Sequence, residues 1–133
     1  QISGIYESPA LGFTKDAPLF YNLAVKLAGC LPPETLIERL LSIEETMGRR
    51  RVVQADGGYS SRVIDIDILL FGDLQIASPQ LVVPHPRMHE RRFALMPLSE
   101  IGETVLVPGS RKPVSELLAC CSDDSVVIRT GDL

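Results

Sequence analysis

Two carboxylates, Asp65 and Asp67, are separated by one residue inside an apolar run with the sequence SRVIDIDILLFG. Successive side chains on a strand point to opposite faces, so both aspartates would share one face and the neighbouring isoleucines the other. With a rise of about 3.3 Å per residue, the two Cα atoms would lie roughly 6–7 Å apart. Carboxylates this close repel each other, and a bound cation would remove the repulsion.

Oxygen ligands of this kind favour Mg²⁺, which takes one or two protein carboxylates and completes its coordination with water and phosphate oxygens. A carboxylate pair can also hold two metal ions about 3.5–4 Å apart, as in phosphoryl-transfer sites. The same pattern fits an amphipathic strand whose aspartates face water. Because the D-x-D tripeptide is short and common, it does not decide between these interpretations.

Basic residues form two clusters, GRRR at 48–51 and HPRMHERR at 85–92, and Arg62 precedes Asp65 by three residues. Each cluster alone is typical of a solvated face. Together with carboxylate-bound metal ions, several guanidinium groups are what a polyphosphate requires, because arginine binds phosphate oxygens in a bidentate manner. The sequence contains neither G-x-x-x-x-G-K-[ST] nor G-x-G-x-x-G, which argues against P-loop and protein-kinase architectures.

The elements that would position these groups follow from the hydrophobic periodicity. Apolar residues at three- and four-residue spacing predict a helix that begins at Pro33 and Glu34 and ends at Gly48. Further helices are predicted at 87–96, stopped by Pro97, and at 113–121. Strands are predicted at 2–7, 20–28, 63–70, 81–83, 105–107 and 126–129. This order indicates an α+β sandwich with helices packed on a mainly antiparallel sheet.

Length and composition are those of an ordinary globular domain. The chain has 133 residues, of which 45% are hydrophobic and 23% charged. A net charge of −4 disfavours nucleic acid and anionic membranes as partners, and no apolar run approaches the roughly 20 residues needed to span a bilayer. Cys30, Cys120 and Cys121 show no metal-ligand spacing, which predicts reduced thiols and a cytoplasmic location.

Segments of the chain, in order, resemble the 6-hydroxymethyl-7,8-dihydropterin pyrophosphokinase family of folate biosynthesis. SRVIDIDILLFG resembles the family signature R-x-x-D-[LIV]-D-[LIV], and VVPHPRMHERRFALMPLSEI (82–101) resembles its V-P-H…M…R-x-F-x-L-x-P-L segment. YESPALG followed by FYNLAV resembles the elements Y-x-T-x-P-x-G and Y-x-N-x-x-V, and IEETMGRRR resembles the helix end I-E-x-x-x-G-R-x-R. The resemblance covers nearly the whole chain.

The resemblance implies a ferredoxin-like α+β domain and an enzyme that uses ATP as cosubstrate. Such an enzyme transfers the β,γ-diphosphate of ATP to the hydroxymethyl group of 6-hydroxymethyl-7,8-dihydropterin and releases AMP. By the resemblance, Asp65 and Asp67 would hold two Mg²⁺ ions that bridge the triphosphate. The implied partners are these small molecules, without nucleic acid or membrane, and the protein would be a monomer or a weak homo-oligomer.

The resemblance also assigns roles residue by residue. The implied catalytic residues are Arg49, Arg62, Asp65, Asp67 and Arg91. The residues implied to bind ATP are Glu44, Arg49, Arg51, Arg62, Ile68, His85 and Arg91. The residues implied to bind the pterin are Ser8, Pro9, Leu11, Phe20, Asn22, Tyr59 and Phe93. The loop at 49–61, which carries Tyr59, is expected to close over the substrate.

Physical chemistry agrees with part of this assignment. A flat heterocycle favours aromatic faces, which Phe20 and Phe93 would supply, and its amide-like edge favours an asparagine such as Asn22. Without the resemblance, the two phenylalanines fit a hydrophobic core, His85 fits a loop and Glu44 fits a helical ion pair.

Family members begin with a strand carrying a G-S-N motif and a long helix, and neither occurs in residues 1–133. We therefore expect residues 1–133 to be a single pyrophosphokinase domain that is incomplete at its N-terminal side. Two other hypotheses are a different magnesium-dependent transferase, such as a nucleotidyl- or glycosyltransferase, and a non-catalytic ferredoxin-like binding module. The four motifs in the family's order argue against both.

Overall fold

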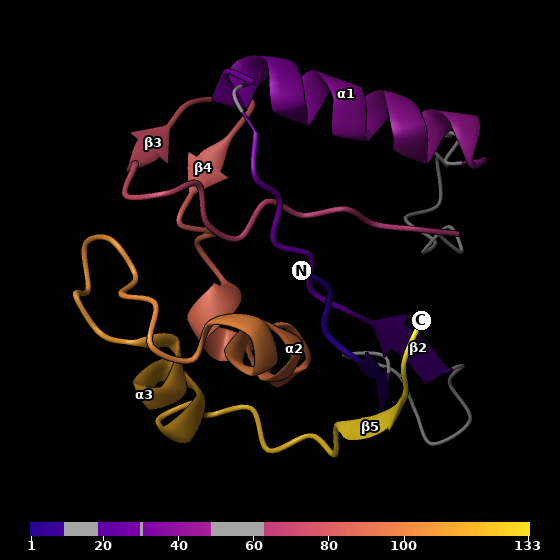
Figure 1. Cartoon of the computed structure of the whole chain (residues 1–133), viewed down its shortest axis with the longest axis vertical. Coiled ribbons are helices and arrows are strands. Elements are labelled where there is room, and N and C mark those ends of the chain that lie inside the picture. Colours follow the sequence, from indigo (N-terminus) through magenta and orange to yellow (C-terminus); the bar gives the residue numbers. More distant parts are fainter. Residues whose placement is uncertain (10–18, 30, 49–62) are drawn as a thin grey trace, which may run out of the picture.

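In a computed structural model of the chain, the described residues are 1–9, 19–29, 31–48 and 63–133. The helices are α1 (Pro33–Thr46), α2 (Arg92–Gly102) and α3 (Val114–Ala119), with a 3-10 turn, η1 (Met88–Glu90), before α2. The strands are β1 (Ile5–Pro9), β2 (Leu19–Asn22), β3 (Ile76–Ala77), β4 (Val82–Val83) and β5 (Ile128–Gly131). Figure 1 shows α1 at one end of the molecule and α2, α3 and the β1–β2–β5 strands at the other.

The described strands form two antiparallel sheets, one with the order β2-β1-β5 and one that pairs β3 with β4. The predicted α+β class with an antiparallel sheet is therefore confirmed. Tyr6 lies opposite Asn22 and Ser8 opposite Phe20, while an isolated bridge joins Ile2 to Val25. The strands predicted at 2–7 and 20–28 are thus confirmed in part, because β1 covers Ile5–Pro9 and β2 ends at Asn22.

Helix α1 confirms the prediction made from its end residues. Pro33 occupies the first turn, where a missing N–H costs nothing because that group has no partner within the helix. Gly48 follows the C-terminal residue Met47 with a φ of +102°, a left-handed conformation that favours glycine. Within this helix only Glu44 is buried, and the apolar side chains of Ile43 and Met47 are about half exposed. No helix in the described parts of the chain is long and apolar enough to cross a membrane.

The prediction that Pro97 stops a helix is wrong. Helix α2 continues through Pro97 to Gly102, and Pro97 is buried inside it. Proline cannot donate a hydrogen bond to the carbonyl one turn earlier, which normally disfavours a helix interior. Here the helix continues because Leu98 packs against the core and Glu100 is hydrogen-bonded to the sheet. Tertiary contacts outweigh the local preference.

The predicted strand at 63–70 is also wrong. Residues 64–71 run extended beside α1 (Figure 1), but none of them pairs in a strand with another described residue. Backbone groups that a sheet would use are instead bonded elsewhere. The N–H of Ile66 donates to the Glu44 side chain at 2.6 Å, and the carbonyl of Leu69 accepts from the N–H of His85 at 2.9 Å. The strand predicted at 105–107 is likewise reduced to one bridge, between Leu106 and Pro113, and the strand β3 was not predicted.

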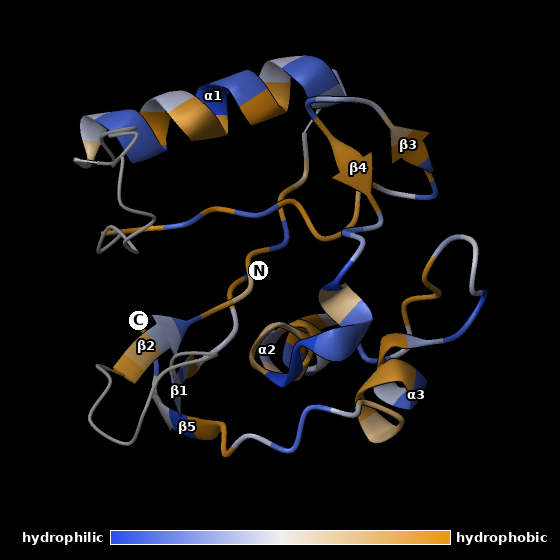
Figure 2. Ribbon diagram, turned by 180° about the vertical axis from the view of Figure 1, so that it is seen from behind, coloured by the Kyte–Doolittle hydropathy of each residue, from blue (hydrophilic) through white to orange (hydrophobic). Residues whose placement is uncertain are grey.

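A hydrophobic core lies between η1, α2, α3 and the turn after α2. It is formed by buried Met88, Leu95, Val107 and Val114. The partly buried residues packed against it are Leu69, Leu70, Leu98, Leu117, Leu118 and Cys121. In Figure 2 the extended segment 63–71 carries hydrophilic positions between hydrophobic ones, and Leu69 and Leu70 near its end pack against this core. The core therefore anchors the segment that carries the aspartates.

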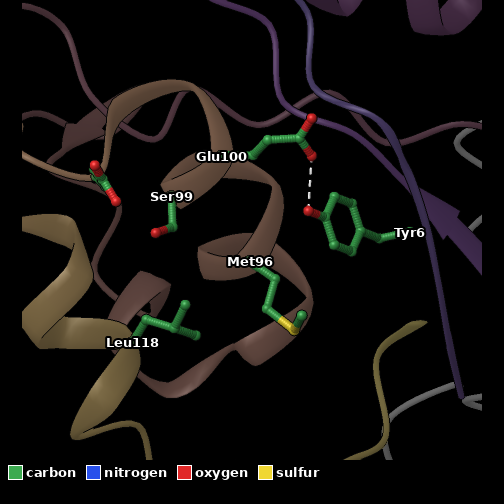
Figure 3. Close-up of a pocket in the computed structure, with 6 residues that line it drawn as sticks. Tyr6, Met96, Ser99, Glu100 and Leu118 are labelled. Carbon is green, nitrogen blue, oxygen red and sulfur yellow. Dashed lines mark hydrogen bonds between the residues drawn. The ribbon is translucent and has the colours of Figure 1, made fainter. Parts of the chain in front are cut away.

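Glu100 attaches α2 to the sheet. Its carboxylate accepts hydrogen bonds from the Tyr6 hydroxyl at 2.7 Å, from the Gly4 N–H at 3.1 Å and from the Arg129 guanidinium at 3.4 Å. Figure 3 shows Tyr6 directed at Glu100 beside a shallow cavity of about 420 Å³. The residues that line this cavity are Tyr6, Met96, Ser99, Glu100, Glu103 and Leu118. No residue of the predicted site is among them.

We expect Glu100→Gln to destabilise the protein in a pH-dependent manner. The Tyr6 hydroxyl, followed by Arg129 and the Gly4 N–H, lowers the pKa of Glu100 below its ordinary value of 4.5. A lowered folded-state pKa contributes stability above the unfolded value, and this contribution is lost as pH falls through the folded value. The deficit in unfolding free energy of the variant should therefore be full near about pH 7 and shrink below about pH 4.5.

Urea unfolding between about pH 3 and pH 8 measures this difference. Glu103→Gln, at the end of the same helix, is the matched control for charge. A deficit that stays constant over the whole range would show that the hydrogen bonds of Glu100 do not stabilise its charged form.

Candidate active site

Asp65 and Asp67 lie on the exposed face of the extended segment, while Ile64, Ile66 and Ile68 between and beside them are partly buried. The alternation expected of a strand is thus retained without strand pairing. The side chain of Asp67 is 53% exposed. Extended backbone is enough to place both carboxylates on one face, because it is the backbone conformation that produces the alternation.

Glu44 holds the backbone between the two aspartates. Glu44 is only 2% exposed, and its Oε1 accepts the N–H of Ile66 at 2.6 Å. A carboxylate oxygen is a strong acceptor for a backbone N–H, so this bond fixes the backbone at Ile66. The resemblance assigns Glu44 to the nucleotide, and the structure places its carboxylate on the backbone of the aspartate segment.

His85 and Arg91 lie beside Asp67. The loop that carries them begins after the cis Val83–Pro84 bond and is attached to the aspartate segment by the bond from His85 N–H to Leu69 O. His85 Nε2 is 4.0 Å from Asp67 Oδ2, and an Arg91 terminal nitrogen is 3.6 Å from the same oxygen. The His85 and Arg91 side chains are only 17% and 22% exposed. The structure therefore brings together three residues that the sequence analysis assigned to one site.

The surroundings of His85 lower its pKa, which favours the neutral ring, and indicate which ring nitrogen carries the proton. Burial lowers the pKa of His85, and Arg91 and Arg87 lower it further, while the Asp67 carboxylate opposes the shift. Nδ1 accepts the Arg87 N–H at 3.1 Å, so the proton of the neutral ring is on Nε2, which faces Asp67. His85 can thus donate one hydrogen bond toward the space beside Asp67.

Arg91 has an unsatisfied donor. Within the described part of the chain, its buried Nε has no hydrogen-bond partner. The guanidinium carbon lies 5.9 Å from the centre of the Phe93 ring, a distance compatible with a cation–π contact. Leaving a buried donor unpaired costs about 1–3 kcal/mol, so an acceptor that reached this nitrogen would be favoured. A phosphate oxygen is such an acceptor, and arginine binds it well.

The residues predicted to bind the pterin that the structure describes lie on β1, β2 and the start of α2. The Nδ2 of Asn22 donates to the Oγ of Ser8 at 2.9 Å, which joins two predicted site residues across neighbouring strands. Phe20 is 44% exposed on β2, and Phe93 is partly buried in the first turn of α2, which contacts that strand. Pro9 ends β1. Ile68 is partly buried on the face opposite the aspartates.

Five predicted site residues lie outside the described residues, so the structure does not test their roles: Leu11, Arg49, Arg51, Tyr59 and Arg62. The predicted closing loop at 49–61 lies there as well.

The chemistry of the described donors fits Mg²⁺. Asp65 and Asp67 offer carboxylate oxygens on one exposed face, and one or two protein carboxylates are what a magnesium–phosphate site uses. No group of three or more His, Cys, Asp or Glu side chains in the described ranges could hold a metal ion by itself.

Asp123 is a residue near the site that sequence reasoning missed. Its Oδ2 accepts the N–H of Arg92, the residue between Arg91 and Phe93, at 2.8 Å. The local sequence predicts only a turn here, which the structure shows as the Ser125 N–H bonded to Asp123 Oδ1 at 3.0 Å. A contact across 31 residues leaves no signal in the spacing of neighbouring residues.

The part of the chain that carries these site residues matches a known protein family. A family model described as 7,8-dihydro-6-hydroxymethylpterin-pyrophosphokinase (HPPK) matches residues 1–103. The chain is similar to proteins named 2-amino-4-hydroxy-6-hydroxymethyldihydropteridine pyrophosphokinase. The one from Bacillus subtilis is 43% identical over 105 residues, which is 79% of this chain and 60% of that protein. The one from Aquifex aeolicus is 38% identical over 116 residues, covering 87% and 69%. The one from Haemophilus influenzae is 34% identical over 125 residues, covering 94% and 74%.

Proposed function

The chain belongs to the 7,8-dihydro-6-hydroxymethylpterin-pyrophosphokinase family, and from this we propose that it provides the site for diphosphate transfer in folate biosynthesis. In the proposed reaction, the hydroxymethyl oxygen of 6-hydroxymethyl-7,8-dihydropterin attacks the β-phosphorus of ATP. The bond from that phosphorus to the oxygen shared with the α-phosphate breaks, AMP leaves with this oxygen, and the hydroxyl proton passes to water. The observation that carries the proposal is the grouping of His85 and Arg91 around Asp67.

The phosphate side of the site follows from this grouping. Asp65 and Asp67 would hold Mg²⁺, proposed as two ions, which would neutralise charge on the triphosphate. Arg91 lies beside Asp67 and would bind phosphate oxygens of the nucleotide, which would give its unpartnered Nε–H an acceptor. His85, with its ring neutral, would donate a hydrogen bond from Nε2–H to the nucleotide.

The pterin side follows from the pairing of Asn22 with Ser8. Because Asn22 Nδ2 donates to Ser8 Oγ, the Oδ1 of the same amide is turned away from that bond. We propose that this oxygen accepts an N–H of the pterin ring and that Phe20 and Phe93 cover the two ring faces. Five further residues belong to the proposed site by resemblance: Leu11, Arg49, Arg51, Tyr59 and Arg62. A cytoplasmic location, expected from the cysteines, is part of the same proposal.

Product identification tests the function. The protein is incubated with ATP, Mg²⁺ and 6-hydroxymethyl-7,8-dihydropterin, and the nucleotides are separated by chromatography. We expect AMP to form only when the pterin and Mg²⁺ are both present, in equal amount to the pterin diphosphate. Formation of ADP would indicate transfer of a single phosphoryl group, and pyrophosphate with a nucleotide-bearing product would indicate nucleotidyl transfer. Either result, or no reaction at all, would contradict the proposal.

A further inference from the structure

Helix α2 begins without a capping side chain of its own. Arg91 is the residue that precedes the helix, with φ −120° and ψ 96°, and its side chain makes no hydrogen bond to the helix end. The first N–H groups of a helix have no partner within it and are usually bonded by a nearby Ser, Thr, Asp or Asn. Here the carboxylate of Asp123, far along the chain, performs this task for the Arg92 N–H.

The peptide group between Arg91 and Arg92 is consequently held at both of its polar atoms. Its carbonyl oxygen accepts the N–H groups of Ala94 at 3.1 Å and Leu95 at 3.0 Å. Its N–H donates to Asp123 Oδ2 at 2.8 Å. Asp123 is itself fixed by the Ser125 N–H on its other oxygen. Burial alone would raise the pKa of Asp123, but these bonds from Ser125 and Arg92 lower it, which keeps the carboxylate charged.

The residues on either side of Arg92, Arg91 and Phe93, both belong to the proposed site. Arg91, on one side of it, lies beside Asp67 with an unpartnered Nε, and Phe93 follows on the other side beneath the guanidinium. A change in ψ of Arg91, which turns this peptide plane, would reorient the Arg91 side chain on the fixed helix and so move its guanidinium relative to the carboxylate. The direction of Arg91 therefore depends on a residue outside the part of the chain that the family model matches, residues 1–103.

We propose that Asp123 is a positioning residue for the transfer reaction. By accepting the Arg92 N–H, it fixes the backbone that directs Arg91 toward the phosphates and Phe93 toward the pterin. The inference rests on the proposed function, but its structural content, the ordering of Arg91, can be measured without catalysis. This role requires no contact between Asp123 and the substrates.

Three variants test the role. Asp123→Ala removes the acceptor, Asp123→Asn retains an oxygen of the same shape without the charge, and Asp124→Ala removes the neighbouring exposed carboxylate as a control. By ¹⁵N NMR, we expect Asp123→Ala to increase the mobility of the Arg91 Nε–H and to speed amide exchange at Arg92 roughly threefold to thirtyfold, as for loss of one helix cap. Asp123→Asn should keep most of the order of the Arg91 Nε–H and most of the slow amide exchange at Arg92. Asp124→Ala should resemble the unaltered protein.

The kinetic arm separates positioning from stability. Measured well below the unfolding temperature, kcat/KM of Asp123→Ala should fall roughly tenfold to a hundredfold, as expected for a misplaced binding group, and Asp123→Asn should recover most of it. An Asp123→Ala protein with a lower melting temperature but unchanged Arg91 mobility and unchanged kcat and KM would overturn the inference. If the unaltered protein releases no AMP, the proposed function fails, and the NMR arm alone decides the role of Asp123.

Discussion

Asp67→Asn is expected to lower kcat for pterin-dependent AMP release by roughly a thousandfold, the upper end of what loss of one electrostatic stabiliser costs an enzyme. The amide has the shape of the carboxylate but no charge. It would bind Mg²⁺ poorly and would leave Arg91, 3.6 Å away, without its counter-charge. Because Asp67 is half exposed, the substitution should change the melting temperature little.

The measurement is kcat at a series of Mg²⁺ concentrations. We expect the variant to require more Mg²⁺ for half-maximal rate, since one carboxylate ligand is lost. Asp73→Asn, in the exposed turn after Gly72, makes the same change of charge and should retain full activity. Activity of Asp67→Asn within about threefold of the unaltered protein would show that the carboxylate is not used, since even one metal-site or oxyanion interaction normally contributes far more.

Arg91→Ala is expected to lower kcat/KM by roughly a hundredfold to a thousandfold, with both a higher KM for ATP and a lower kcat. The guanidinium is the described cation nearest Asp67, and its buried Nε–H can donate a hydrogen bond to a new acceptor. Arg91→Lys should recover little of the loss. Lysine has no donor at the position of Nε and cannot present a planar fork to phosphate or lie flat on Phe93.

Steady-state kinetics with ATP varied at saturating pterin, and the reverse, measure the two constants separately. Arg39→Ala, an exposed arginine of α1, removes the same charge at a distance from the site and serves as the control. Full rescue by lysine would show that Arg91 acts only as a diffuse positive charge. Unchanged kinetics in Arg91→Ala would remove it from the site.

Two acidic side chains share one structural role in this protein. Glu44 accepts the N–H of Ile66, which lies between Asp65 and Asp67, and Asp123 accepts the N–H of Arg92, which lies between Arg91 and Phe93. In each case a carboxylate from a distant segment holds the one backbone N–H between two residues of the proposed site. The side chains of the site can then remain partly exposed to their ligands, while hydrogen bonds from Glu44 and Asp123 fix the backbone.

The sequence alone determined the features that depend on local backbone geometry and on the kind of side chain. It placed Asp65 and Asp67 on one face, because alternation follows from extended backbone whether or not the segment joins a sheet. It also placed the ends of α1, because proline and glycine restrict φ in opposite ways. Two of the motifs that carry the family resemblance, SRVIDIDILLFG and IEETMGRRR, contain these local patterns.

The tertiary structure decided what depends on residues far apart in the chain. Whether 63–70 pairs as a strand depended on Glu44 and His85 bonding its backbone, and the continuation of α2 past Pro97 depended on Leu98 and Glu100. The lowering of the pKa of His85 and the cap supplied by Asp123 likewise depend on residues that the fold brings together. The periodicity of hydrophobic residues indicates which face of a helix or strand is apolar, and it does so only over short stretches of chain. The partner that meets this face is selected by packing of the whole chain, which the spacing of neighbouring residues does not encode.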